Sequence, residues 1–207
     1  MKWTSMVTAS IAASVVVTVA AVGSASAASS GIATHLLRAG EQTGFHVSSK
    51  VSRIPTISAY VTWSGDKGAA AKADRKLLKK TGFVDAAAEH LAGSGGKQGF
   101  SIVGSFSRSD GPAEARNALF ASAVSSQRET GTTLTRFRIP GVPTARGVTA
   151  ISSDGVATAN VYWTEGRCTL GSGLYLPDAG SMTPTQVDAP VVHGIRTQLR
   201  RSGGHCS

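Results

Sequence analysis

Several residue patterns that carry chemistry are missing from this chain of 207 residues. Neither the two cysteines nor the five histidines have the Cys-x-x-Cys or His-x-x-x-His spacing that places two metal ligands together. The twelve acidic residues are thinly spread, no Gly-x-Ser-x-Gly elbow is present, and "GSGGKQG" lacks the Ser or Thr that follows a P-loop lysine. The sequence therefore predicts no metal, no cofactor and no catalytic residue, and it favours a protein that is not itself an enzyme.

The N-terminal apolar run is shorter than the roughly 20 residues that a membrane-spanning helix needs. It extends from Met6 to Val22, follows Lys2, and precedes Ala25-Ser26-Ala27, whose small residues suit a signal peptidase. We expect residues 1–27 to be a cleaved signal peptide, with a retained membrane anchor as the alternative. Residues 28–207 would then form a single secreted α+β domain without a transmembrane segment. No cysteine follows the small residues, so a bacterial lipid-attachment site is not predicted.

Acidic residues are outnumbered by basic ones, 12 to 21, which gives a formal charge of +9. Residues 1–27 contain Lys2 and no acid, so the predicted mature chain carries 9 − 1 = +8. Such a chain is attracted to polyanions, and the alternative is that the charge only maintains solubility. The basic residues crowd one predicted helix and one strand face. The candidate anion-binding residues are Lys72, Arg75, Lys76, Lys79, Lys80, Arg136 and Arg138.

The two cysteines, Cys168 and Cys206, predict a disulfide because an exported pair meets oxidising conditions. A strand from Cys168 to Leu176 covers about 26 Å. A following helix of about 17 residues returns a similar distance if it packs back antiparallel. The glycine-rich tail then delivers Cys206 near Cys168. A catalytic thiol and a zinc ligand beside His205 are the alternatives.

Apolar periodicity predicts the elements of the domain. Strands are expected at 56–65, 99–107, 134–140, 147–152, 156–163 and 167–176. Helices are expected near 32–39, and at 64–82, 83–93, 109–127 and 183–201, the last with a capping box at Thr183 and Gln186. Consecutive strands joined by tight turns make antiparallel pairs. We therefore expect an α+β fold, with an antiparallel sheet of about five strands and helices packed on one face as a two-layer sandwich.

Five stretches carry a resemblance: "LLRAGEQTGF", "TGFVDAAAEHL", "FSIVGSF", "FRIPGVPTARGV" and "VYWTEGR". In their order and spacing the chain resembles a family of uncharacterised secreted proteins and lipoproteins of actinobacteria. That family is loosely similar to small α+β domains of the PsbP and Mog1 type. The resemblance implies an α+β fold and brings no catalytic residues. The chain departs from the family's pattern at Gln42-Thr43, where a proline-containing stretch is usual, and in lacking a lipobox cysteine.

Compartment and charge together predict a secreted or cell-envelope binding or accessory protein. Its expected partner is an anionic cell-wall polymer, a lipid-like ligand or an envelope protein, and nucleic acid is not expected because no basic motif with interleaved aromatics is present. The oligomeric state is left open. One alternative is an envelope-acting hydrolase, which a pocket joining a histidine, a carboxylate and a serine would favour. The other is an inhibitor of secreted proteases, with Arg146 at the tip of an exposed loop, "IPGVPTARG".

Overall fold

The computed structural model describes residues 31–128 and 132–206, so the predicted signal peptide at 1–27 lies outside the described residues. A 3-10 helix, η1 (Gly31–His35), stands where a longer helix was predicted near 32–39. The strands are β1 (His46–Val47), β2 (Ser52–Ile54), β3 (Phe83–Ala92), β4 (Gln98–Phe106), β5 (Thr132–Ile139), β6 (Val142–Ser152), β7 (Ala157–Glu165) and β8 (Cys168–Leu176). The helices are α1 (Ile57–Ser64), α2 (Gly68–Thr81), α3 (Gly111–Ser126) and α4 (Pro184–Ser202), with a short 3-10 turn, η2 (Ser94–Gly96), between β3 and β4.

The strands form one antiparallel sheet in the order β1-β3-β4-β8-β7-β6-β5, and β2 also pairs with β3. Tight turns connect β5 to β6, β6 to β7 and β7 to β8, as expected for a meander. The α+β class is thereby confirmed. The sheet has eight strands rather than about five, because β1 and β2 add to one edge and β3 is itself a strand.

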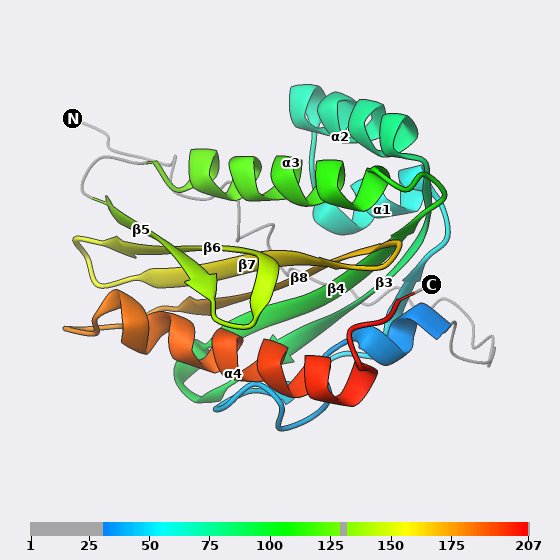
Figure 1. The fold of residues 1–207 in the computed structure, drawn as a ribbon. Helices are drawn as coiled ribbons and strands as arrows, with labels where there is room; N and C mark the ends of the chain where they lie inside the picture. Colours follow the sequence, from blue (N-terminus) through cyan, green and yellow to red (C-terminus); the bar gives the residue numbers. More distant parts are fainter. Residues whose placement is uncertain (1–30, 129–131, 207) are drawn as a thin grey trace.

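Helices cover both faces of this sheet, whereas the sequence predicted helices on one face (Figure 1). On one face, Val161 and Trp163 of β7 belong to the largest core cluster, together with Val191 of α4. The alternate residues of β7 point the other way, toward α3, which also packs against β7. Here Leu78 of α2 and Ala115 of α3 form a smaller cluster with Phe106 of β4. The arrangement therefore has three layers instead of two.

Residues 57–64 are the helix α1, and the prediction of a strand there was wrong. The alternation of Ile57, Ala59, Val61 and Trp63 fits a strand, but the segment is only 8 residues long and carries helix signals at both ends. The side chain of Thr56 accepts a hydrogen bond from the Ala59 backbone, and Gly65 ends the helix in the left-handed region at φ 74°. These caps favour a helix over a strand in so short a run.

Residues 83–92 form the strand β3, and the helix predicted at 83–93 was wrong. Its alanines are strong helix formers in isolation. Here β3 lies between two packed layers, and Ala87 and Ala88 are 0% exposed on its opposite faces. Ala88 packs in a cluster with Ile54, against which Tyr60 and Trp63 of α1 pack. Small residues let the layers approach closely, so tertiary packing overrides the local propensity.

The C-terminal tail is fixed to the end of the β7–β8 hairpin. Cys168 and Cys206 form the predicted disulfide, with their Cα atoms 5.7 Å apart. The backbone N–H of Arg167 also donates to the Cys206 carbonyl at 2.9 Å. Gly166 has a φ of 52°, and a side chain at that position would collide with the same carbonyl. The hairpin and the tail therefore fit together only with glycine in the turn.

Candidate functional site

The predicted basic residues of α2 gather on its outer surface. Lys72, Arg75, Lys76, Lys79 and Lys80 are all exposed, and their spacing of three and four residues places them as one stripe along the helix. We call these five residues the α2 stripe. Lys80 alone has an ion-pair partner among the described residues, Glu114 of α3. The positive charges near the C-terminus also suit the negative end of the helix dipole.

Arg136 and Arg138 lie apart from the α2 stripe, on the exposed strand β5. The guanidinium of Arg136 lies 5.9 Å from the centre of the Phe120 ring in α3. Arg138 donates through Nη1 to the Ala145 carbonyl at 3.1 Å. Helix α3 lies between α2 and β5 (Figure 1). The seven predicted residues thus fall into two groups rather than one site.

Beneath α2, a small cavity separates the helices from the sheet. Asp74 borders this space, and burial raises the pKa of its carboxyl to about 7, with a hydrogen bond and repulsion from Asp66 adding to the effect. The remaining lining is mainly apolar and includes Tyr60, Leu78, Phe106, Leu119 and Leu170. Water-sized molecules can occupy about 30 Å³ of it. This is room for about one water and far below the several hundred Å³ of a typical ligand pocket, so the space does not hold a lipid-like molecule.

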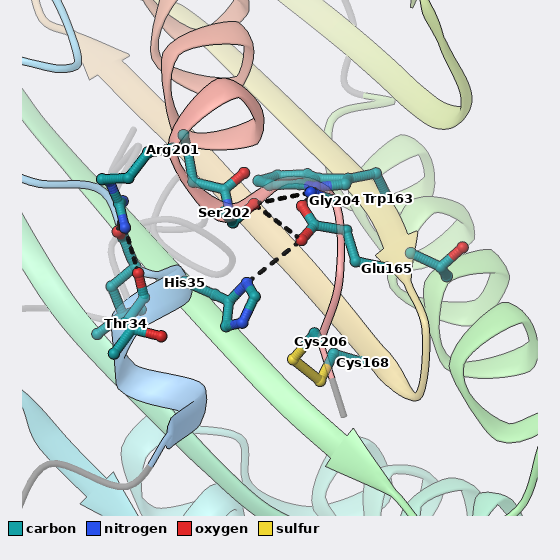
Figure 2. A network of polar contacts seen from close by, with 12 residues as sticks. Thr34, His35, Trp163, Glu165, Cys168, Arg201, Ser202, Gly204 and Cys206 are labelled. Carbon is teal, nitrogen blue, oxygen red and sulfur yellow. Dashed lines mark hydrogen bonds and ion pairs between the residues drawn. A yellow bond between two sulfur atoms is a disulfide. The ribbon is translucent and has the colours of Figure 1, made fainter.

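On the opposite face, the carboxylate of Glu165 accepts hydrogen bonds from Trp163, His35 and Ser202, which lie around it in Figure 2. Trp163 donates through Nε1 to its Oε1 at 2.9 Å. At its Oε2, His35 Nδ1 lies 3.2 Å away and the Ser202 hydroxyl 3.3 Å away. The donors come from β7, η1 and α4, so this buried carboxylate joins three elements beside the disulfide.

His35, Glu165 and Ser202 come together, as the hydrolase alternative required, but their arrangement differs from that of a hydrolytic triad. In a hydrolytic triad the imidazole lies between the nucleophile and the carboxylate. Here Glu165 lies in the middle, and both His35 and Ser202 bind its Oε2. The Ser202 hydroxyl therefore donates to a carboxylate that already accepts from Trp163 and His35. It does not contact a histidine that could act as its base. The geometry favours positioning of the tail and η1 over hydrolysis.

A second polar cluster on this face surrounds Arg201 of α4. Its guanidinium donates to both oxygens of Glu41, at 2.7 and 3.1 Å, and to the carbonyls of Leu36 and Thr34. Although burial raises the pKa of Glu41, the hydrogen bonds from Arg201 and from the Arg38 backbone, with the charges of both arginines, outweigh it and lower the pKa. Nearby Glu89 is 3% exposed, and its Oε1 has no partner. Burial, with repulsion from Glu41, raises the pKa of Glu89 to about 7.

The exposed loop that the protease-inhibitor alternative required is not formed. Residues 142–152 are the strand β6, and only Pro140 and Gly141 turn between it and β5. Arg146 is paired with Tyr162 of β7 in the sheet and is partly buried. The expectation that Arg146 forms a loop tip was therefore wrong. The prolines suggested a braced loop, but Pro143 lies on the strand.

Two negative findings concern the described residues, 31–128 and 132–206. No three His, Cys, Asp or Glu side chains gather there in a way that could hold a metal ion. No helix within these ranges is long and apolar enough to cross a bilayer.

No protein-family model and no curated protein matches the chain. The solved structures similar to it include two mycobacterial proteins. The extracellular domain of PknH from Mycobacterium tuberculosis is 12% identical, with a TM-score of 0.39, over 74% of this chain and 79% of that one. An uncharacterised protein from Mycobacterium smegmatis, an Rv0999 orthologue, is 13% identical with a TM-score of 0.39, over 78% and 90%. Both are mycobacterial and neither is described as a PsbP or Mog1 domain, so that part of the resemblance stays a prediction. Likenesses at this level carry no inference about function.

Proposed function

We propose that the chain is an exported, non-enzymatic binding protein of the cell envelope that holds an anionic polymer along the α2 stripe. The observation that carries this function is the exposure of all five basic side chains on one helix surface, with a single acidic partner for Lys80. A row of cations at helical spacing matches repeated negative charges along a flexible chain and needs no enclosed pocket.

Export is supported by the sequence of residues 1–27 and by the disulfide, which forms most readily outside the reducing cytoplasm. Among the predicted partners, the anionic polymer suits the exposed α2 stripe, and the cavity beneath that helix has room for about one water and does not accommodate a lipid-like ligand. Binding through exposed charges is screened by salt, which gives the proposal a direct test.

The test is co-sedimentation of the mature protein with purified bacterial cell walls at low and at high salt. We expect binding at low salt that is released at high salt. A variant with Lys72→Gln, Lys76→Gln and Lys79→Gln should bind about tenfold more weakly, since three exposed charges at about 0.5 kcal/mol each contribute about 1.5 kcal/mol.

The matched control removes three exposed charges elsewhere, with Lys50→Gln, Arg53→Gln and Arg196→Gln. It lowers the net charge equally and should retain more of the binding. Equal retention on the walls at low and high salt, or equal weakening in both triple variants, contradicts a role for the α2 stripe.

A further inference from the structure

Three arginines from three elements meet at the start of β6. Arg116 of α3 donates through Nη1 to the Thr144 carbonyl at 3.1 Å. Arg138 of β5 donates through Nη1 to the Ala145 carbonyl, also at 3.1 Å. Arg146 is the next residue along β6. Its side chain points to the α3 side of the sheet, as does that of Tyr162, its partner on β7. The arginines of α3, β5 and β6 therefore surround one short stretch of backbone.

The three arginines of the cluster differ in how deeply their side chains are buried. Arg116 is only 9% exposed, Arg146 is partly buried, and Arg138 is exposed at the rim. The Nε of Arg146 is fully buried and has no hydrogen-bond partner. Burial lowers the pKa of Arg116, and repulsion from Arg146 and Arg138 lowers it further.

No carboxylate balances these charges within the described residues. The ion pairs there are Lys80–Glu114, Arg108–Asp110, Arg201–Glu41 and His35–Glu165, and none includes a member of the cluster. A guanidinium stays protonated at all accessible pH values, so the cluster cannot relieve the repulsion by losing a proton. Half-buried like charges destabilise a fold until a counter-charge is supplied.

The hydrogen bonds leave donors for such a counter-charge. The Nε and Nη2 of Arg116 both donate to Asn117 Oδ1, at 3.3 and 2.8 Å. Arg116 therefore contributes mainly its positive charge to the cluster. Nε and Nη2 of Arg138 have no partner among the described residues, and neither have Nη1 and Nη2 of Arg146, whereas the Nε of Arg146 is closed off from solvent. A tetrahedral dianion can accept from several donors arriving from different directions, whereas a carboxylate offers one charge in one plane.

We propose that Arg116, Arg138 and Arg146 form a binding site for a phosphate group, free or carried by a larger molecule. The site lies between α3 and the β5–β6 hairpin, and it shares no residue with the α2 stripe. It therefore does not depend on the proposed function. Arg136, held over Phe120 on the same side of β5, adds to the positive field at the entrance.

The test is calorimetric titration of the mature protein with inorganic phosphate, against sodium chloride at matched ionic strength. We expect saturable binding of one phosphate per chain and a rise in melting temperature that chloride does not give. Arg146→Gln should weaken binding at least about tenfold, the value of one charge-assisted hydrogen bond. Without phosphate the same variant should melt higher than the native protein, because one repulsive charge is removed.

Exposed Arg138→Gln tests the site with little risk to folding and should also weaken binding. Arg53→Gln on β2 removes an equal charge from an exposed position and should bind phosphate as the native protein does. The triple glutamine variant of the α2 stripe should also bind normally, so the two proposals can fail separately. No saturable heat with phosphate, or binding unchanged in both Arg146→Gln and Arg138→Gln, overturns the proposal.

Glycerol 3-phosphate and vesicles containing phosphatidylglycerol distinguish the source of the phosphate group. Competition by glycerol 3-phosphate without vesicle binding supports a soluble or polymeric phosphate. Vesicle binding that Arg138→Gln abolishes supports a lipid headgroup. Failure of both to compete with inorganic phosphate limits the site to the free ion.

Discussion

The two faces of the sheet differ in how the charges of their arginines are matched. On the α4 face, one continuous apolar cluster surrounds the disulfide, and Glu165, Glu41 and Arg201 each have several close partners. On the α3 face, the apolar contacts form two smaller clusters beside a cavity, and three arginines have no acidic partner among the described residues. Matched polar groups hold elements together, whereas unmatched charges leave binding capacity for a partner. We therefore expect stability to depend mainly on the α4 face, and both proposed binding sites lie on the α3 side of the sheet.

The largest expected effect is on the α4 face, from removing the disulfide with Cys168→Ala and Cys206→Ala. The bridge closes a loop with a sequence separation of 38 residues. In the chain-entropy model this loop stabilises the fold by about 4 kcal/mol. Urea unfolding of the double variant should show a loss close to this figure. A loss below about 1 kcal/mol would contradict the assignment of stability to this face.

The next effect concerns Glu89, the buried carboxyl on the α4 face that lacks a full set of partners. Its pKa is raised from 4.5 to about 7 in the fold, so the folded state binds the proton more tightly than the unfolded chain. Its contribution to stability is complete below pH 4.5 and is lost as the pH rises through 7. Glu89→Gln should flatten this decline and stabilise the protein at pH 8 by up to about 3 kcal/mol.

The measurement is urea unfolding at pH 5 and pH 8, with Glu114→Gln as a control on the α3 face. Glu114 belongs to an exposed ion pair, so its substitution should change stability by less than about 1 kcal/mol at either pH. If the native protein and Glu89→Gln show the same pH dependence, Glu89 does not titrate in this range.

The smallest expected effect is that of an Ile→Val substitution made once on each face, which compares how tightly the two faces are packed. Ile195 of α4 is 0% exposed, and Ile102 of β4 is 8% exposed and borders the cavity. A methyl group beside an existing space has fewer contacts to lose. Ile195→Val should cost about 1.5 kcal/mol and Ile102→Val about 0.5 kcal/mol, measured by thermal or urea unfolding. Equal losses of unfolding free energy in the two variants would contradict a difference in packing between the faces.

The elements with local signals could be predicted from the sequence. The capping box of α4 is present: the Gln186 N–H donates to the Thr183 hydroxyl at 3.4 Å, and the Thr183 N–H donates to Gln186 Oε1 at 2.8 Å. The disulfide followed from the lengths of β8 and α4. The strand β3 could not be predicted, because its alanines reflect close packing of two layers rather than a local preference.

The α2 stripe was visible in the sequence because a helix places residues three and four apart on one surface. The arginine cluster was visible only through Arg138. Arg116 and Arg146 come from a different helix and a different strand, and no spacing along the chain relates them. Arg146 was placed in a loop because two prolines precede it nearby, and its burial depends on pairing with Tyr162.

The position of β5 at the end of the strand order has a consequence for association between copies of the chain. An unpaired strand edge offers hydrogen bonds to any other extended segment and is a common start of aggregation. Two β5 strands that paired in this way would bring Arg136 and Arg138 close to the same residues of the other copy. Like charges across paired strands repel. Arg136 and Arg138 thus disfavour pairing of two chains along this edge.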